Sequence, residues 1–167
     1  MKNEWIELPI ATSDGIFLAH YSEKGLAALD FPKVRSARCA ARTLRRGVPT
    51  KILRWHRLTT GGLKAALAGR AAKELPPLDW TGKTEFQKSV WRAMLKLGPG
   101  KTMSYGEVAV AIGRPKAVRA VGTACGANSI PVLVPCHRIL AANNKIGGFG
   151  GGLEWKRKLL AREGLIL

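Results

Sequence analysis

The sequence predicts an α/β N-terminal lobe with a small antiparallel sheet, followed by a mostly α C-terminal domain that contains a helix-turn-helix. Residues 6–29 have the pattern of short strands separated by turn signals, whereas amphipathic helical patterns with clear capping residues dominate from Thr84 onward. Between these regions, Pro76-Pro77 marks an extended segment. We therefore expect a structural lobe over residues 1–78 and a second domain over residues 79–167.

Turn signals and basic residues characterise the N-terminal lobe. Ser13-Asp14-Gly15 and Glu23-Lys24-Gly25 contain the residue types of tight turns and separate the predicted strands. Residues 35–57 are dense in arginine and lysine, and we interpret them as the solvated face of a helix. An alanine-rich pattern predicts a second helix over residues 60–73.

Capping residues define the predicted helices of the C-terminal domain. Thr84 can cap a first amphipathic helix, and Ser104 with Glu107 has the capping-box spacing at the start of a second. The second helix is expected to end at Gly113, and Pro115 lies at the start of a third. The two short helices predict a helix-turn-helix. The first helix carries its apolar residues on one face, and these are Phe86, Val90, Trp91, Met94 and Leu95.

The charge of the chain indicates a polyanionic partner. Lys and Arg number 28 against 11 Asp and Glu, which gives a formal net charge of +17 over 167 residues. Such an excess attracts nucleic acids through phosphate contacts, although net charge also keeps a protein in solution. Charge alone does not distinguish DNA from RNA or from an anionic membrane surface.

The cysteines and histidines form neither a disulfide framework nor a metal site in the sequence. The three cysteines are odd in number, stand far apart and include no CxxC pair. None of the three histidines has metal-ligand spacing to a cysteine, so we expect no metal and no cofactor. These residues are Cys39, Cys125 and Cys136, and His20, His56 and His137.

The location of the protein is expected to be cytoplasmic. No apolar run is long enough to span a bilayer, and residues 1–14 lack a basic-then-apolar signal layout. We expect no membrane contact, and association with the nucleoid if the source is prokaryotic.

The strongest chemical signal is the adjacent pair Cys136 and His137. A thiol reacts as thiolate, and it therefore needs a cation, a base or a helix terminus nearby. His137 offers a base and Arg138 adds positive potential, so we expect a thiol pKa below that of a free cysteine. The alternative is a buried structural cysteine, because sequence neighbours do not necessarily touch through their side chains.

The predicted second helix of the helix-turn-helix is unusual for a DNA reader. Its residues are nearly all small, with Arg119 as the one cation in the stretch 117–124. Such a helix suits close approach to a minor groove, where shape is read, rather than base reading in the major groove. The alternative is a buried core helix whose arginine reaches solvent.

Six motifs lie in the second half of the chain. They are FQKSVW (86–91), SYGEVA (104–109), RPKAVRAVG (114–122), PCHRI (135–139), GGFGGG (147–152) and LLAREG (159–164), with Asn128 eight positions before Cys136. Together they resemble the O6-alkylguanine-DNA alkyltransferase family, also called methylated-DNA–protein-cysteine methyltransferases. The resemblance covers residues 84–165. It implies DNA repair by direct damage reversal, in which an alkyl group passes irreversibly from O6-alkylguanine in double-stranded DNA to Cys136, once per molecule.

The resemblance also implies roles for individual catalytic residues. Cys136 is similar to the acceptor thiol, and His137 to the residue that deprotonates it through a bound water. Glu163 resembles the carboxylate that orients His137. Asn128 resembles the residue that ties the helix-turn-helix to the active-site turn, and Tyr105 the tyrosine that protonates the leaving guanine.

Further residues are expected to bind DNA or the flipped base. Arg119 resembles the arginine that fills the gap left by the extruded nucleotide. The resemblance also places Ser104, Lys116, Ala117, Val118 and Gly122 at the DNA surface. It places Pro131, Ile139, Gly147, Gly148, Phe149 and Gly150 around the base, with the Cys136 and Ile139 carbonyls as acceptors for its amino group.

Departures from the family pattern concern the glycine-rich loop. Phe149 and Gly150 stand where relatives commonly have tyrosine and serine, and two hydroxyls that could bind the base are absent, each worth about 1 kcal/mol. A monomer without metal is expected, and cooperative binding on DNA is left open.

Three other functions are alternatives to alkyl transfer. Alkyltransferase-like proteins, which bind damaged DNA without accepting the alkyl group, have tryptophan in place of Cys136. A DNA-binding regulator would account for Arg119, but it would give Cys136 and Glu163 no functional role. A cysteine hydrolase would need an oxyanion site, for which the sequence gives no indication.

Overall fold

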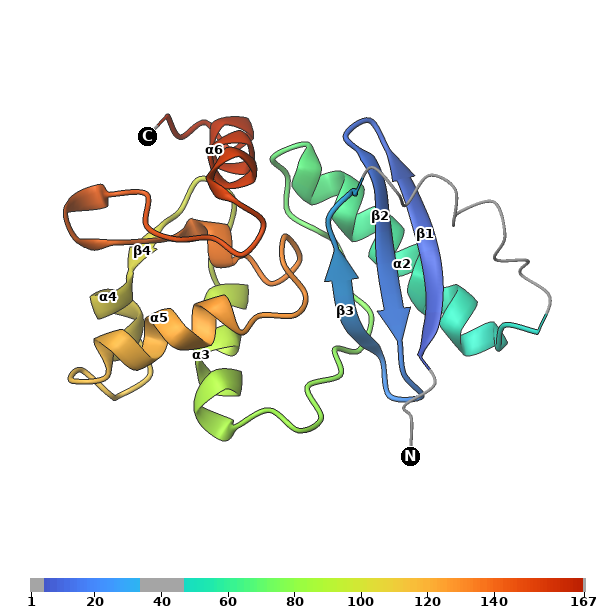
Figure 1. Cartoon of the computed structure of the whole chain (residues 1–167), viewed down its shortest axis with the longest axis horizontal. Helices are drawn as coiled ribbons and strands as arrows, with labels where there is room; N and C mark the ends of the chain where they lie inside the picture. Colours follow the sequence, from blue (N-terminus) through green and yellow to red (C-terminus); the bar gives the residue numbers. More distant parts are fainter. Residues whose placement is uncertain (1–4, 34–46, 167) are drawn as a thin grey trace.

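The computed structural model describes residues 5–33 and 47–166. Figure 1 shows a three-stranded sheet with helix α2 (Thr50–Leu67) across one face, and a helical C-terminal half beside strand β3. Residues 68–84 connect the two halves in a largely extended course. This arrangement agrees with the predicted α/β lobe and mostly α C-terminal domain. Among the described residues, no helix has the length and apolar character needed to cross a membrane.

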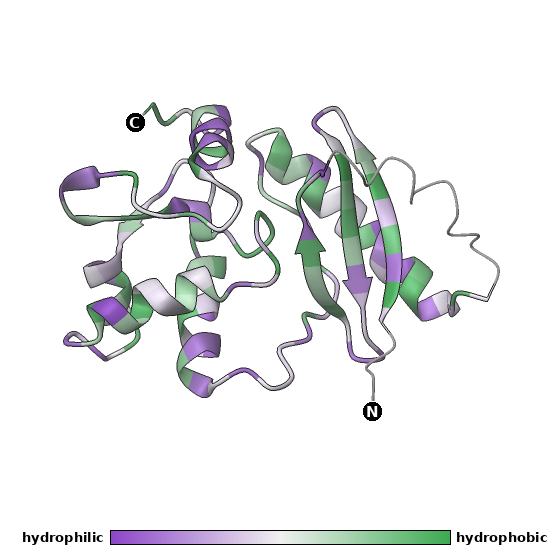
Figure 2. Ribbon diagram, in the orientation of Figure 1, coloured by the Kyte–Doolittle hydropathy of each residue, from purple (hydrophilic) through white to green (hydrophobic). Residues whose placement is uncertain are grey.

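The sheet is antiparallel in the order β1 (Ile6–Thr12), β2 (Gly15–Tyr21), β3 (Leu26–Asp30). Both predicted turns are confirmed, since β1 passes to β2 through residues 13–14 and β2 to β3 through residues 22–25. The first turn is held by Thr12, whose hydroxyl donates to the Gly15 carbonyl and accepts from the Asp14 amide. The alternation of the strands points their large apolar side chains inward, and Figure 2 shows hydrophobic residues along all three strands.

The predicted helix over residues 60–73 is wrong in position. Helix α2 begins ten residues earlier, after Pro49, and ends at Leu67. The hydroxyl of Thr59 donates to the Trp55 carbonyl within the helix, so this threonine does not cap a new one. Gly69, with φ of +69°, ends the helical course. Arg54 and Arg57 are exposed on α2, as expected for a solvated face, whereas Arg42, Arg45 and Arg46 lie outside the described residues.

The C-terminal half contains four α-helices among the described residues. They are α3 (Glu85–Leu95), α4 (Tyr105–Ala111), α5 (Val118–Gly126) and α6 (Leu153–Arg162). Strands β4 (Met103–Ser104) and β5 (Ile139–Leu140) form a short parallel pair, and 3₁₀ turns span Cys136–Arg138 and Ala142–Asn144.

The capping predictions for α3 and α4 are confirmed, because Thr84 with Gln87 and Ser104 with Glu107 form complete capping boxes. Three details differ. Helix α4 ends at Ala111 rather than Gly113, and Pro115 lies in the turn before α5. Leu95 is 36% exposed, because it lies at the last turn of α3, beyond the face that Val90 and Met94 bury.

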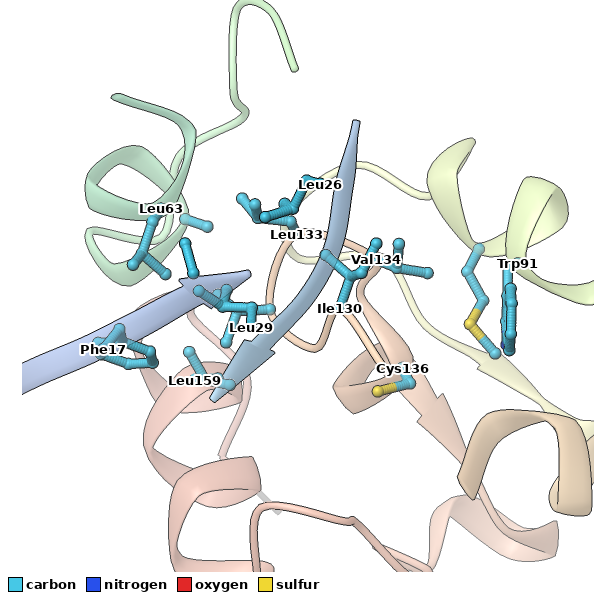
Figure 3. Close-up of a cluster of buried hydrophobic side chains, with 14 of the residues drawn as sticks. Phe17, Leu26, Leu29, Leu63, Trp91, Ile130, Leu133, Val134, Cys136 and Leu159 are labelled. Carbon is cyan, nitrogen blue, oxygen red and sulfur yellow. The ribbon is translucent and has the colours of Figure 1, made fainter. Parts of the chain in front are cut away.

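One hydrophobic cluster joins the two halves. Leu26 and Leu29 of β3 belong to the same cluster as Ile130, Leu133 and Val134, which lead to Cys136, as Figure 3 shows. Two hydrogen bonds reinforce the contact, because the Leu29 amide donates to the Ser129 carbonyl and the Ser129 hydroxyl to the Ala27 carbonyl, both at 2.9 Å. The sheet therefore supports the turn that carries the cysteine.

The β1–β2 turn also contacts the C-terminal half through an ion cluster. The Asp14 carboxylate, 4% exposed, lies 2.7 Å from Lys158 Nζ and accepts both guanidinium NH groups of Arg162 at 2.7 and 2.9 Å. The hydrogen bonds from Arg162 lower the pKa of Asp14 to about 2. Both cations belong to α6, so the sheet is tied to the last helix.

Replacing Asp14 with asparagine is expected to lower the free energy of unfolding at pH 7 by about 1 to 2 kcal/mol. The loss is not larger because Lys158 and Arg162 are partly exposed, so that solvent screens their attraction to Asp14. The carboxyl has a lower pKa in the folded than in the unfolded chain, so its contribution is present above about pH 4 and is lost as the pH falls towards 2. Urea unfolding at pH 7 and pH 3 measures the difference. Glu23→Gln, in the exposed second turn, is the control. An equal loss at both pH values would assign the effect to packing instead of charge.

Candidate functional site

Cys136 lies at the end of a tight, buried turn that Asn128 organises. The Asn128 Nδ2 group donates to the Val134 carbonyl at 2.9 Å and to Cys136 Sγ at 3.1 Å, and its Oδ1 accepts from the Ile130 amide at 3.0 Å. Asn128 follows directly after α5, so it connects this helix to the cysteine. Val132 within the turn has φ of 71°, which is strained for a β-branched residue. The surrounding contacts therefore hold the turn in one shape.

The residue after the cysteine belongs to a buried ionic network. His137 Nε2 lies 3.0 Å from Glu163 Oε1, and both side chains are 1% exposed. Glu163 also accepts from Arg138 Nε and Nη2 and from the Gly100 amide, while Arg138 Nη1 donates to the Leu97 carbonyl. Because a carboxylate accepts the His137 Nε2 proton, the lone pair of neutral His137 lies on Nδ1, which is buried and has no described partner.

The expected lowering of the Cys136 pKa is wrong in direction. Burial raises the pKa of the Cys136 thiol, and the Asn128 hydrogen bond and the Lys156 charge offset only part of this effect. Burial likewise lowers the pKa of His137, against the raising effect of Glu163. Burial also raises the pKa of Glu163, but the hydrogen bonds from His137 and Arg138 outweigh this and bring it to about 2. The resting pair is therefore a neutral thiol and a neutral imidazole beside a carboxylate.

Two cavities meet at Cys136. The smaller has a volume of about 160 Å³ and is lined by Cys136, Cys125, Tyr105 and Gly122 together with Gly148, Phe149 and Gly150. Burial raises the pKa of Tyr105, which keeps its hydroxyl protonated. The larger cavity, about 510 Å³, adds Asn128 and Pro131. Most residues that the resemblance places around the base thus surround one thiol.

Ile139 and Gly147 line neither cavity. The Ile139 carbonyl accepts a hydrogen bond from Lys156 Nζ at 2.6 Å, and the Cys136 carbonyl accepts from the Ile139 amide. Each carbonyl keeps a second lone pair. The two carbonyls that were expected to accept hydrogen bonds from the base therefore already accept one hydrogen bond each within the protein.

The helix-turn-helix presents an exposed surface of small residues. Helices α4 and α5 contact each other and α3, and Lys116, Val118 and Arg119 are exposed, while Ala117 and Gly122 are half-buried. Ser104 uses its hydroxyl to cap α4, accepting from the Glu107 amide at 3.1 Å. Val121 and Ala124 form the buried side of α5, so Arg119 points away from the core face. Of the two interpretations of this helix, the structure favours the surface one over the fully buried one.

Within the described residues, no group of three His, Cys, Asp or Glu side chains could hold a metal ion. Cys125 and Cys136 are both free thiols, while Cys39 lies outside the described residues.

Comparison with known proteins extends these observations. A sequence profile for the DNA-binding domain of 6-O-methylguanine DNA methyltransferase matches residues 85–165. The methylated-DNA–protein-cysteine methyltransferase of Salmonella typhimurium is 44% identical over 111 residues, which are 64% of this chain and 65% of that protein. A Mycobacterium tuberculosis protein of the same name is 48% identical over 101 residues, or 60% and 61% of the two chains. The matched parts thus span less than two thirds of these curated relatives.

A solved structure matches over almost the whole chain. The crystal structure of M. tuberculosis O6-methylguanine methyltransferase superposes with a TM-score of 0.70 at 34% identity and covers 95% of this chain and 92% of that one. The chain belongs to the O6-methylguanine-DNA methyltransferase family. An archaeal family member from Pyrococcus kodakaraensis, at 24% identity, shares the fold with a TM-score of 0.64.

The departure of this chain from the family pattern at Phe149 has a structural explanation. The Phe149 ring packs against Phe31 of the sheet lobe at 5.8 Å between centroids and against His137 at 6.4 Å, both edge to face. Phe31 in turn packs on Trp155 of α6 at 4.9 Å. An aromatic cluster of Phe31, Phe149 and Trp155 therefore holds the glycine-rich loop against the sheet lobe.

Sequence reasoning missed two residues of the site. Lys156 is fully buried, and its ammonium donates to the Ile139 carbonyl and, at 3.3 Å, to the Gly148 carbonyl, so it links the active-site turn to the glycine-rich loop. Its position three and four residues before the buried Leu159 and Leu160 is the signal that could have identified it. Cys125 lines both cavities, and burial raises its pKa to about 12. It follows that Cys125 is a neutral thiol at pH 7.

Proposed function

We propose that this member of the methyltransferase family repairs DNA by direct reversal, as a methylated-DNA–[protein]-cysteine S-methyltransferase that acts once per molecule. The observation that carries the proposal is the placement of the Cys136 thiol at a small cavity beside Tyr105, with His137 adjacent in the chain and hydrogen-bonded to Glu163. Double-stranded DNA carrying O6-alkylguanine is the proposed substrate. A crystallised M. tuberculosis homologue in complex with DNA, 34% identical to this chain, supports DNA as the partner.

The proposed reaction balances without a cofactor. His137 takes the thiol proton on Nδ1, directly or through one water, and Glu163 stabilises the imidazolium that forms. Sγ then attacks the alkyl carbon, so that an S–C bond forms as the C–O6 bond breaks. Tyr105 donates a proton to the leaving guanine and recovers one from the imidazolium. The products are unmodified guanine and a thioether on Cys136, which is not readily hydrolysed.

The raised thiol pKa is compatible with this reaction. A buried neutral thiol costs much less free energy to desolvate than a thiolate, and the proton is removed only when the guanine is bound. The Asn128 N–H, which donates to Sγ, stabilises the thiolate as charge develops. Lys156 adds positive potential, because its charge lowers the pKa of Cys136.

The helix-turn-helix is proposed to deliver the base. The small residues Ala117, Val118 and Gly122 of the α5 region allow a close approach to the minor groove, while Ser104 and Lys116 bind the backbone. Arg119 fills the stack after the nucleotide turns out into the cavity, since the target atom cannot be reached inside a duplex. We assign these tasks to residues 79–167, acting as a monomer in the cytoplasm, and structural support to residues 1–78.

A DNA-binding regulator remains the competing class of function, because it would use the same helix-turn-helix. It does not require the Asn128–Cys136 contact or the buried His137–Glu163 pair. The two functions differ in one property: only the methyltransferase changes covalently when it meets damaged DNA.

Incubation with a duplex that contains O6-methylguanine is therefore expected to add one methyl group to each protein molecule, on the peptide that holds Cys136. Mass spectrometry of the intact protein and its peptides measures this. Cys136→Ser should stay unmodified, whereas Cys125→Ser should still be methylated. Repeated turnover, or a methyl group on another residue, would contradict the proposal.

A further inference from the structure

The basic stretch of the N-terminal lobe has no task in the proposed alkyl transfer. Residues 31–73 contain twelve Lys and Arg and no Asp or Glu, although the whole chain has 11 acidic residues. Six of these cations lie in residues 47–73, within α2 and directly after it. A strong excess of positive charge therefore lies outside the helix-turn-helix.

Helix α2 separates its apolar residues from its basic ones. Ile52 and Leu63 are buried on the side of the helix that covers the sheet. Arg54, Arg57 and Lys64 are exposed. With 3.6 residues per turn, these three cations lie within about 80° of one another around the helix axis, on the side opposite Ile52 and Leu63. They form one basic face, which points away from the sheet.

The three cations of this basic face have no acidic partner. Within residues 5–33 and 47–166, none of their side chains forms a hydrogen bond or an ion pair. Other helices of the protein do pair their cations, as Lys88 does with Glu85 on α3 and as α6 does with Asp14. Like charges three residues apart, such as Arg54 and Arg57, destabilise a helix. The stability of the lobe therefore does not account for this face.

The chemistry of the basic face fits the phosphates of duplex DNA. From Arg54 to Lys64 the helix rises about 15 Å, and a duplex presents one negative charge for about every 1.7 Å of its axis. Exposed Lys and Arg bind such phosphates without reading bases. A membrane surface fits less well, because Ile52 and Leu63 are buried against the sheet and the helix lacks the wide apolar face that interfacial helices insert into lipid.

The basic face also lies apart from the helix-turn-helix. Figure 1 shows α4 and α5 towards one end of the long axis of the molecule, and α2 in the other half, on the sheet. The two surfaces belong to different halves of the chain, so each can bind its own length of DNA.

We propose that the basic face of α2, formed by Arg54, Arg57 and Lys64, is a second DNA-binding surface, which binds the phosphates of another duplex segment while the helix-turn-helix binds the first. The protein then bridges two segments of undamaged DNA. This binding depends on neither a damaged base nor Cys136, so it goes beyond the proposed alkyl transfer and does not require it.

The test counts duplexes on each protein molecule. An undamaged duplex of about 12 base pairs, slightly longer than one helical turn, is titrated in excess at low salt, and sedimentation velocity gives the mass of the complex. The unmodified protein is expected to bind two duplexes. The variant Arg54→Gln/Arg57→Gln/Lys64→Gln is expected to bind one, and the salt dependence of total binding should flatten by about two to three units of slope, close to one unit for each phosphate contact.

A matched control removes the same charge from scattered positions. The variant Lys24→Gln/Lys96→Gln/Arg157→Gln replaces three exposed cations, one each in the β2–β3 turn, at the end of α3 and on α6. It should still bind two duplexes. Circular dichroism checks that both variants are folded, which we expect because all six side chains are exposed.

The outcomes separate this inference from the proposed function. An unmodified protein that binds one duplex overturns the second surface, and so does an equal loss in the two variants, which would assign the effect to net charge. If the α2 variant keeps both duplexes but loses binding to phosphatidylserine vesicles, the face binds lipid and the inference is wrong. Methyl transfer to Cys136 at saturating duplex should be unchanged in the α2 variant. A protein that binds two duplexes but transfers no methyl group would support the second surface and overturn the proposed function.

Discussion

Glu163→Gln is expected to slow alkyl transfer at least about a hundred-fold, the lower range for loss of positioned acid–base catalysis. The carboxylate accepts hydrogen bonds from His137, Arg138 and the Gly100 amide in a site that is almost closed to solvent. An amide cannot accept from all three donors, and it does not stabilise the imidazolium. Because the group that takes the thiol proton is His137, Glu163 acts as a positioning residue. Single-turnover transfer with saturating duplex measures the loss.

The pH profile separates this role from a purely structural one. His137 must be neutral to accept a proton, and Glu163 raises its pKa. Without the carboxylate the pKa of His137 falls further, so the acid limb of the rate profile should move to lower pH. Glu154→Gln, at an exposed position in the first turn of α6, is the control and should leave the rate and the profile unchanged. A slower variant whose acid limb stays in place would show that Glu163 only holds Arg138 and the fold.

Arg119→Ala is expected to slow repair in duplex DNA by about ten-fold or more, while reaction with free O6-benzylguanine changes little. Arg119 is exposed on the face of α5 opposite its buried side, which is where a residue that enters the stack would lie. Filling the gap offsets unstacking, which costs a few kcal/mol for a paired base, and a free base needs no extrusion. The rates should be compared at one salt concentration, with the protein saturated by duplex so that weaker binding cannot imitate a slower step.

Lys116→Ala provides the matched comparison, because it removes an exposed cation from the same motif. A phosphate contact should lower affinity and flatten the salt dependence by about one unit of slope, with the saturated rate preserved. If Arg119→Ala shows only that behaviour, Arg119 is a phosphate ligand. Equal slowing on duplex and free base would instead place Arg119 in the chemistry or the fold.

Local signals in the sequence were sufficient for much of the fold. The two hairpin turns and the capping boxes at Thr84 and Ser104 depend on neighbouring residues, and they were predicted correctly. The start of α2 was missed, because the prediction followed the alanine-rich pattern from residue 60, whereas the helix begins after Pro49.

In the site, too, features that depend on neighbouring residues were predicted, whereas features that depend on the tertiary fold were not. Cys136 and Glu163 were found through motifs, although only the fold brings their segments together. The direction of the Cys136 pKa depends on burial, which comes from segments far away in the sequence, and so the adjacent His137 and Arg138 gave the wrong sign. Lys156 was missed as a site residue because its helical spacing with Leu159 and Leu160 indicates burial but does not indicate an active site.

The hydrophobic cluster that joins β3 to the turn before Cys136 has a consequence for the dynamics of the molecule. Leu29, Ile130 and Leu159 cannot separate without exposing one another, so neither half has a core that is closed by itself. The free energy needed to open either half alone would then be nearly as large as the free energy of global unfolding. Backbone amides of the sheet and of α5 should therefore exchange with deuterium at rates set by one common free energy, and the chain should melt in a single transition.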